Sequence, residues 1–405
     1  MRPVVFVAPF FLETTLRFVD AAASLPGVGV GLISEDPEEK LPPGLRAKLA
    51  AHWRVDDGMD PFQIAGGVRA LSAHLGGCEK LLGALEELQV PLAEVREGLG
   101  IEGMDVETAR NFRDKARMKD VFGAAGVPCA PHRLVGDAQQ ALSFANEVGF
   151  PLVAKPPAGA GARSTFRLDD ADSLGQWLAA QPPRHDAPFL LEEFVQGEEH
   201  SFDSVLIGGR MIWHSISQYL PTPLEVLRNP WIQWAVILPR EIGDEFNDIR
   251  IAAVRGLEAL GLVTGLTHME WFRRKDGSIA ISEVAARPPG AQFTTLMSYA
   301  HDLNFYRAWA ELMIFDRFDP PERQFAVGAA FLRGQGTGRV TAIHGVDEVA
   351  RSLAPIVVEA KLPQPGQAPS GTYEGEGYVV VRHEDTAVVE EAIRQLVTTI
   401  KVELG

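Results

Sequence analysis

The segment HMEWFRRKDGSIAISEVAARPPG, residues 268–290, decides the fold. Two apolar, strand-like stretches flank Asp276-Gly277, a pair typical of the two-residue type I′ hairpin turn, in which both central residues have positive φ. Counting outward from this turn sets Glu270 opposite Glu283. Because side chains alternate along a strand, the two carboxylates then lie on the same face of the hairpin. Directly opposed like charges destabilise a sheet, so the pair predicts a positively charged partner between them.

A hard divalent cation is the partner that makes such a carboxylate pair favourable. Mg²⁺ takes oxygen ligands, typically one or two carboxylates, and completes its shell with water and phosphate oxygens. Arg287 lies four residues beyond Glu283, on the same face by parity, and a guanidinium can bind a phosphate in bidentate fashion. The alternative is a surface hairpin with ordinary charges and another register. The flanks GSIAIS and GLTHM are too apolar for an exposed ribbon.

The bulk properties bound the class of protein. The 405 residues suffice for two to four domains of about 100–200 residues, and no window approaches the roughly 20 apolar residues of a membrane span. The first apolar run is too short and too soon broken by charge for a signal peptide. A net charge of −16 disfavours nucleic-acid phosphates as a partner. Cys78 and Cys129 alone cannot form a disulfide framework or a multi-cysteine zinc site, so we expect a cytoplasmic protein.

The first hundred residues predict β/α units, with strands at PVVFVA (3–8) and VGVGLIS (28–34) and a helix between them. The turn after the first strand has no glycine fingerprint, so a dinucleotide held in the Rossmann manner is not expected. A single helix is expected from its N-cap Asp105 to Gly126, where glycine and the following proline stop it.

Strands predicted at 151–156 and 165–168 flank a glycine-rich loop, and 189–209 predicts a strand, a polar turn and a second strand. A helix near 243–260 precedes the hairpin, and helical sequence follows it to about residue 316. The Pro- and charge-rich stretch FDRFDPPERQ marks the boundary to a C-terminal part of mixed strands and a final helix. The predicted class is α/β plus α+β.

Two lysines are candidates for phosphate binding. Lys155 closes the strand VAKP and precedes Gly159 and Gly161 in PPAGAGARS. A lysine beside a glycine-rich loop can hold phosphate oxygens while the loop amides add donors. A P-loop would instead need Gly-Lys-Ser/Thr opening a helix. Lys115 lies in RDKARMKD. For either lysine alone, a surface turn or a solvated helix face is the alternative.

The acidic segment LLEEFVQGEEHSFD has a strand-turn-strand pattern. An exposed strand edge there could offer backbone groups to an adenine ring, and Glu199 could accept hydrogen bonds from ribose hydroxyls. A solvated acidic turn is the alternative. His268 shares the face of Glu270 by parity and could contact substrate, or it could be a satisfied core histidine.

Along the chain, the motifs are a lysine, a lysine with a glycine-rich loop, an acidic strand-turn-strand segment, paired glutamates and an arginine. In this order they resemble the ATP-grasp superfamily of ADP-forming ligases and carboxylases. The resemblance covers essentially the whole chain and implies an ATP-grasp fold in three parts. These parts are a Rossmann-like pre-ATP-grasp domain at 1–105, an ATP-grasp domain at 106–318 and a small C-terminal α+β domain at 319–405. The ATP-grasp domain would divide into subdomain A, about 106–190, and subdomain B, about 191–318.

The resemblance also implies which residues hold ATP, namely Lys115, Lys155, Gly159, Gly161, Glu192, Glu193, Val195 and Glu199. The lysines and glycines would contact phosphates, EEFV would form the adenine hinge and QGEE would bind the ribose. Glu270 and Glu283 would hold Mg²⁺, or alternatively Mn²⁺, while Arg287 and Lys155 would be catalytic at the reacting phosphate. Many members have Asn in the last motif where this chain has Ala285, so a second metal ion would be held more weakly.

The activity implied is an ATP-dependent carboxylate–amine ligase, which forms an amide or peptide bond through an acyl phosphate. Its partners would be a small-molecule carboxylate and an amine, and analogy with relatives favours a homodimer. The alternatives are a purine-pathway or biotin-carboxylase-like enzyme acting on formate or bicarbonate, and a non-catalytic nucleotide-binding module. The aromatic residues Tyr219, Trp231 and Trp234 predict a pocket wall for a partly apolar acceptor, with core packing as the alternative.

Overall fold

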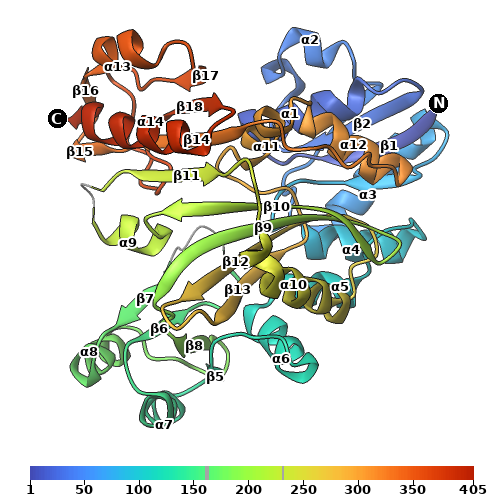
Figure 1. Ribbon diagram of the computed structural model, residues 1–405. Helices are drawn as coiled ribbons and strands as arrows, with labels where there is room; N and C mark the ends of the chain where they lie inside the picture. Colours follow the sequence, from blue (N-terminus) through green and yellow to red (C-terminus); the bar gives the residue numbers. More distant parts are fainter. Residues whose placement is uncertain (160–163, 230–231) are drawn as a thin grey trace.

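The computed structural model describes residues 1–159, 164–229 and 232–405 (Figure 1). Gly161 and Trp231 therefore lie outside the described residues. The described strands form four sheets. No described helix combines the length and the hydrophobicity needed to cross a bilayer.

The N-terminal part is a parallel four-stranded sheet in the order β3-β2-β1-β4. Its strands are β1 (Arg2–Val7), β2 (Val28–Ser34), β3 (Ala51–Arg54) and β4 (Lys80–Leu82). Its helices are α1 (Glu13–Ala23), α2 (Pro43–Arg46), α3 (Pro61–Leu75) and α4 (Gln89–Leu99). The apolar side chains of β1 and β2 are buried on both faces, as expected for a parallel sheet covered by helices. The predicted β/α organisation is confirmed here.

An antiparallel sheet of eight strands crosses the middle of the molecule in the order β13-β12-β9-β10-β11-β14-β18-β17. Its strands are β9 (Gly197–Ile207), β10 (Arg210–Leu220), β11 (Trp234–Leu238), β12 (Gly265–Arg274), β13 (Ile279–Ala285), β14 (Ala326–Leu332), β17 (Val357–Lys361) and β18 (Gly377–His383). The C-terminal strands β14, β18 and β17 thus continue the same sheet as the hairpin. The domain boundaries at 105 and 318 stay predictions.

A four-stranded antiparallel sheet lies at the opposite end of the molecule from the chain termini (Figure 1). In the order β5-β8-β6-β7 it contains β5 (His132–Val135), β8 (Phe189–Glu193), β6 (Leu152–Lys155) and β7 (Phe166–Leu168), with α7 (Ala138–Val148) and α8 (Ala171–Ala180) packed on it. We call it the small sheet. It contains the predicted Lys155 strand and the first strand of the acidic segment.

The remaining elements connect or cover these sheets. The other helices are α9 (Pro223–Arg228), α10 (Asn247–Leu260), α11 (Phe293–His301), α12 (Phe305–Phe315), α13 (Val346–Leu353) and α14 (Thr386–Thr399). The fourth sheet has three strands in the order β15 (Gly334–Gly336), β19 (Lys401–Leu404) and β16 (Val340–His344). Asp385 caps α14, as predicted, but β19 after it was not predicted. Helix α12 packs between the N-terminal part and the large sheet: Trp309 lies edge-on against Phe6 and Phe18, and the helix also contacts β12.

The single helix expected between Asp105 and Gly126 is wrong, because the chain forms two helices there. Helix α5 (Val106–Arg113) begins at its cap Asp105, as predicted, and α6 (Lys115–Ala125) ends at Gly126, which has φ 65°. Asp114 interrupts them: its backbone is extended, and its carboxylate accepts from the first amides of α6. Asp is a strong N-cap, and this local preference outweighs the continuous helical pattern. The break sets Lys115 at the start of α6.

The hairpin brings Glu270 opposite Glu283, as predicted, although the predicted turn is wrong. Only Gly277 has positive φ, 84°, and the Arg274 amide donates to Ser278, so the loop has three residues instead of two. This moves the register by one residue. A β-bulge at Ser282 restores the register, because it adds one residue to β13 before Glu283. The two deviations cancel at the carboxylate pair.

Candidate active site

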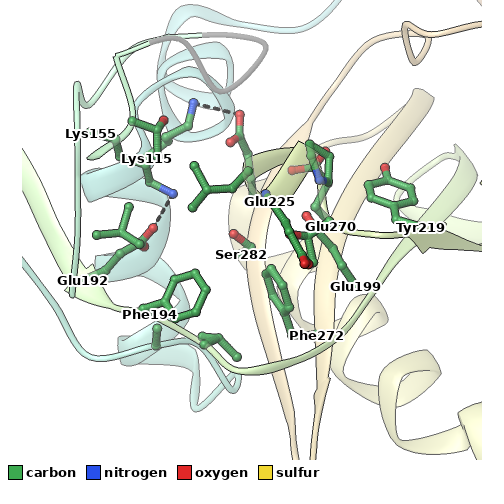
Figure 2. A pocket seen from close by; sticks show the side chains of 18 of the residues that line it. Lys115, Lys155, Glu192, Phe194, Glu199, Tyr219, Glu225, Glu270, Phe272 and Ser282 are labelled. Atoms are coloured by element: carbon green, nitrogen blue, oxygen red, sulfur yellow. Dashed lines mark hydrogen bonds and ion pairs between the residues drawn. The ribbon is translucent and has the colours of Figure 1, made fainter. Parts of the chain in front are cut away.

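One cavity of about 660 Å³ is lined by residues of both the small and the large sheet. Every described residue of the predicted site lines it: Lys115, Lys155, Gly159, Glu192, Glu193, Val195, Glu199, Glu270, Glu283 and Arg287. Figure 2 shows the lysines and Glu192 on one side of the cavity and Glu199, Glu270 and Tyr219 on the other. Ala285, which replaces the expected Asn, also lines the cavity. The fold therefore gathers the separate motifs around one space.

On the side of the small sheet, lysines surround one buried carboxylate. Glu192 is 6% exposed and pairs with Lys155 and, at 3.0 Å, with Lys119. Burial alone would raise the pKa of Glu192, but the two ammonium groups outweigh it and lower the pKa to about 2. Burial likewise opposes the charge of Lys155, and Glu192 and Glu283 raise its pKa in spite of it.

Lys119 is a site residue that the sequence analysis missed. It is fully buried in α6, one helical turn after Lys115, and lines the same cavity. Residues four apart share a helix face, so the spacing RDKARMKD carried a signal for it. Lys115 itself is not on a solvated face: it is buried, and its ammonium donates to the Gly159 carbonyl at 2.9 Å.

The predicted hinge comprises the last two residues of β8, Glu192 and Glu193, and Val195 just after it. The carboxylate of Glu193 accepts two hydrogen bonds from Arg274, both at 2.7 Å, so the side chains of Glu192 and Glu193 are both engaged in ion pairs. Contacts from this segment to a base would come from the backbone. Among the residues that the structure describes, the backbone of Val195 has no hydrogen-bond partner. The rings of Phe194 and Phe272 line the cavity beside it (Figure 2).

On the large sheet, the carboxylate pair is asymmetric. Lys115 lies 2.8 Å from Glu283, whereas the only ion-pair partner of Glu270 in the described chain is His268 at 3.8 Å. Burial raises the pKa of Glu270, and the neighbouring Glu283 adds to the shift. Burial also works against ionisation of Glu283, but Lys115 and Lys155 outweigh it and lower its pKa. A carboxylate without a close cation, beside a second carboxylate, fits a site for a divalent cation.

The donor set favours Mg²⁺ over a cation that needs many protein ligands. No group of three or more His, Cys, Asp or Glu side chains with metal-site geometry occurs in the described ranges. Mg²⁺ is typically held by one or two carboxylates together with substrate phosphates. Glu270 and Glu283 supply two carboxylates, and the methyl group of Ala285 supplies no oxygen.

Arg287 is held in place by a residue from the N-terminal part. Its Nε donates to Glu86 at 2.7 Å and its Nη1 to the Pro288 carbonyl at 2.9 Å. Its Nη2 has no hydrogen-bond partner within the described chain. Burial opposes the charge of Arg287, yet Glu86 raises its pKa. No local pattern indicated Glu86, which comes shortly after β4 and lies 201 residues before Arg287 along the chain.

His268 is part of a buried hydrogen-bonded chain beside the carboxylate pair. Its Nδ1 lies 2.7 Å from the Asp203 carboxylate and its Nε2 lies 3.2 Å from the Tyr219 hydroxyl. Burial opposes protonation of His268, but Asp203 outweighs it and raises the pKa. The histidine is thus both satisfied by hydrogen bonds and located in the wall of the cavity.

Glu199 lies on β9, opposite Phe272 of β12. It is buried, and its carboxyl group has no hydrogen-bond partner among the residues described. Burial, with a contribution from Glu270, raises its pKa well above the usual value. A buried carboxyl group that lines a cavity without a partner is a suitable contact for ligand hydroxyls.

Comparison with known proteins supports the same class. No protein-family model matches the chain. The uncharacterized protein y4rH of Sinorhizobium fredii is 28% identical over 78% of this chain and 66% of its own length. An alanine–anticapsin ligase of Bacillus subtilis is 27% identical over 59% and 54%, and an L-arginine-specific L-amino acid ligase of the same species is 22% identical over 66% and 67%. The chain therefore spans about a half to two thirds of these relatives.

Solved structures match over the full length. An L-amino acid ligase from Bacillus licheniformis superposes with a TM-score of 0.80 at 18% identity, covering 100% of this chain and 99% of that one. N5-carboxyaminoimidazole ribonucleotide synthetase from Thermotoga maritima gives a TM-score of 0.72 at 18% identity, with full coverage of both chains. The fold is the ATP-grasp fold. Several of the similar proteins are amino-acid ligases.

Proposed function

We propose that the protein is an ATP-dependent carboxylate–amine ligase that joins two amino acids or amino-acid-like substrates. The observation that carries this proposal is the convergence of three features on one cavity: the lysines, the facing carboxylates of Glu270 and Glu283, and the free Nη2 of Arg287. The similarity to L-amino acid ligases supports the choice of substrates.

The reaction has two steps. A substrate carboxylate oxygen attacks the γ-phosphorus of ATP, the bond from that phosphorus to the β,γ-bridging oxygen breaks, and ADP leaves. The resulting acyl phosphate is then attacked at its carbonyl carbon by an amine. The carbon–oxygen bond to phosphate breaks, inorganic phosphate leaves, and the amine nitrogen loses a proton as the amide forms.

The residues of this chain serve the first step mainly by position and charge, which is what phosphoryl transfer requires. Lys115 and Lys155 would bind phosphate oxygens of ATP, and Gly159 would sit against them through its backbone. Arg287 would direct its Nη2 at the phosphoryl group as negative charge moves onto the leaving oxygen. Mg²⁺ held by Glu270 and Glu283 would supply neutralisation of phosphate charge.

The nucleoside would lie across the junction of the two sheets. The free backbone groups of Val195 would contact the adenine edge, with Phe194 and Phe272 against its faces, and Glu199 would bind the ribose hydroxyls. These assignments explain why Glu199 is buried without a partner, since a ligand hydroxyl would satisfy it.

The test is release of ADP and phosphate from Mg-ATP in the presence of pooled amino acids and other small carboxylates. We expect release that requires both an acid and an amine, with an amide or peptide detected by mass spectrometry. Release that requires bicarbonate or formate would instead establish the carboxylase or purine-pathway alternative. Binding of ATP without release under any condition would favour the non-catalytic module or a substrate outside the pools. Cytoplasmic location and a homodimer stay predictions.

A further inference from the structure

Four aromatic side chains from four separate elements form a continuous surface at one end of the cavity. They are Tyr219 of β10, Trp234 of β11, Phe293 of α11 and Tyr373 of the segment between β17 and β18. The ring centroids of Trp234 and Tyr373 are 4.7 Å apart, and those of Trp234 and Tyr219 are 5.6 Å apart. Phe293 completes the surface at 5.7 Å from Tyr219. We call these four residues the aromatic wall.

The aromatic wall lies at the end of the cavity away from the lysines. Figure 2 shows Tyr219 beyond Glu270 on the side opposite to Lys155. The hydroxyl of Tyr219 lies 3.2 Å from His268, whose ring is 5.1 Å from Phe293. The wall is therefore next to the carboxylate pair, whereas the nucleotide would occupy the lysine end. Under the proposed function, an amino-acid substrate would bind at this end of the cavity.

The geometry of the rings decides what chemistry they suit. A cage for an ammonium group needs rings that face one another across an open space. Here neighbouring rings are in direct edge-to-face or tilted contact, with interplanar angles of 85° for Tyr219 and Trp234 and 79° for Trp234 and Tyr373. The rings contact one another directly, so the wall presents ring faces and ring edges as one largely apolar surface. Such a surface suits stacking and edge contacts with a large apolar group.

Core packing explains only part of the wall. Trp234, Tyr219 and Phe293 are at most 4% exposed and belong to the largest hydrophobic core cluster. Tyr373 is partly exposed and comes from a segment outside the regular strands, yet its ring covers Trp234 at the cavity. A polar anchor lies close by in Arg287, whose Nη2 is free to bind a carboxylate or an acyl phosphate.

We propose that the aromatic wall binds the side chain of one amino-acid substrate and selects large apolar side chains, aromatic ones above all. This inference rests on the proposed ligase function and names the substrate class of the same site. Tyr373 is then a specificity-determining residue that the sequence analysis did not identify.

The experiment compares pairs of amino acids in the ADP-release assay, with phenylalanine, leucine or alanine as one member. We expect pairs that contain phenylalanine to have a kcat/KM about 10–200-fold above pairs of small amino acids, the range that hydrophobic pockets achieve. Tyr373→Ala should lower the value for phenylalanine pairs and leave alanine pairs within a few-fold. Tyr373→Phe keeps the ring and should keep the preference. Tyr299→Ala, in α11 and outside the cavity, is the matched control and should leave the ratio unchanged.

A binding measurement separates the two levels of the proposal. Phenylalanine and alanine are titrated into each variant with Mg-ADP present, and binding is followed by calorimetry. If phenylalanine binds more tightly and Tyr373→Ala removes the difference, but no pair releases ADP, the ligase function is refuted and the wall stands. If phenylalanine and alanine bind equally, or if Tyr373→Ala affects every pair alike, the wall is refuted even though the ligase function stands.

Discussion

The two sides of the cavity handle buried charge in opposite ways. On the small sheet, Glu192 is enclosed by Lys119 and Lys155, and each charge has a partner within the protein. On the large sheet, His268 at 3.8 Å is the only ion-pair partner of Glu270 among the described residues, and the pKa of Glu270 is raised by burial and by Glu283. Buried charges are costly unless paired. The first side thus has its charges paired within the protein, and under the proposed function the second would bind a cation that arrives with the substrate.

The largest effect is expected on catalytic activity, when the carboxylate pair of the large sheet is changed. Glu283→Ala should reduce Mg²⁺-dependent ADP release about 1000-fold or more, because the metal pair loses a carboxylate. The fold should persist, since the repulsion between Glu270 and Glu283 disappears and Lys115 keeps its hydrogen bond to Gly159. Steady-state ADP release and thermal unfolding are the measurements. Asp276→Asn, in the turn of the same hairpin, is the control, and normal turnover of Glu283→Ala would remove the metal site from the proposal.

The next largest effect is expected on the free energy of unfolding, which should respond differently to changes on the two sides of the cavity. Glu192→Gln leaves two buried ammonium groups without their carboxylate and should lower the free energy of unfolding by about 3–5 kcal/mol. The matched change Glu270→Gln removes a carboxylate that has no close cation and should alter stability little or raise it. Urea unfolding of both variants at pH 7 makes the comparison. Equal losses would show that the sides do not differ as described.

The dependence on pH has opposite signs for the same two residues. The folded pKa of Glu192, about 2, lies below its usual 4.5, so its contribution to stability is complete above pH 4.5 and is lost as the pH falls toward 2. The folded pKa of Glu270 is raised, so its contribution is complete at low pH and is lost as the pH rises through that pKa. The stability gap between wild type and Glu192→Gln should therefore narrow in acid. Unfolding curves between pH 7 and pH 3.5 test it; a gap that widened would contradict the assignment.

A smaller effect should follow from the link between the N-terminal part and the site. Glu86→Ala releases the Nε of Arg287 and should lower kcat about 10–100-fold, the cost of one hydrogen bond to a charged group. Glu86→Gln keeps an acceptor and should recover most of this loss, with the KM for ATP unchanged in both. Steady-state kinetics with each variant decides the matter. An effect on ATP binding alone would show that Glu86 acts elsewhere.

The smallest effect is expected at the hinge. Arg274→Gln breaks the bidentate ion pair with Glu193. The side chain of Arg274 is 25% exposed and that of Glu193 is 29% exposed. Partly exposed ion pairs contribute about 0.5–1 kcal/mol, so the free energy of unfolding should fall by that amount. Chemical denaturation measures the change, and Arg273→Gln on the neighbouring strand position is the reference. A loss comparable to that of Glu192→Gln would show that the hinge is as tightly coupled as the lysine side.

Residues close together in the sequence explain most of what could be predicted. The Glu270–Glu283 pairing follows from a short hairpin, and the strand of Lys155 follows from local apolar pattern and turn residues. Even there, the loop length was predicted wrongly and the bulge at Ser282 corrected the register. A β-bulge is stabilised by contacts across the sheet, which the local sequence does not reveal. The division of α5 from α6 at Asp114 shows the same limit for helix caps within a continuous pattern.

By itself, the sequence predicted the ATP-grasp fold, the order of the motifs and ten of the described residues that line the cavity. Those features depend on short-range pattern, where side-chain alternation and turn chemistry are dictated by neighbours along the chain. Only the tertiary structure decided which charges are paired, because Lys119 meets Glu192, and Arg287 meets Glu86, from elements that no local pattern connects. Burial and distance set the strength of those interactions. Local sequence pattern indicated which residues belong to the site, whereas tertiary packing determines which of their charges are paired and how strongly they interact.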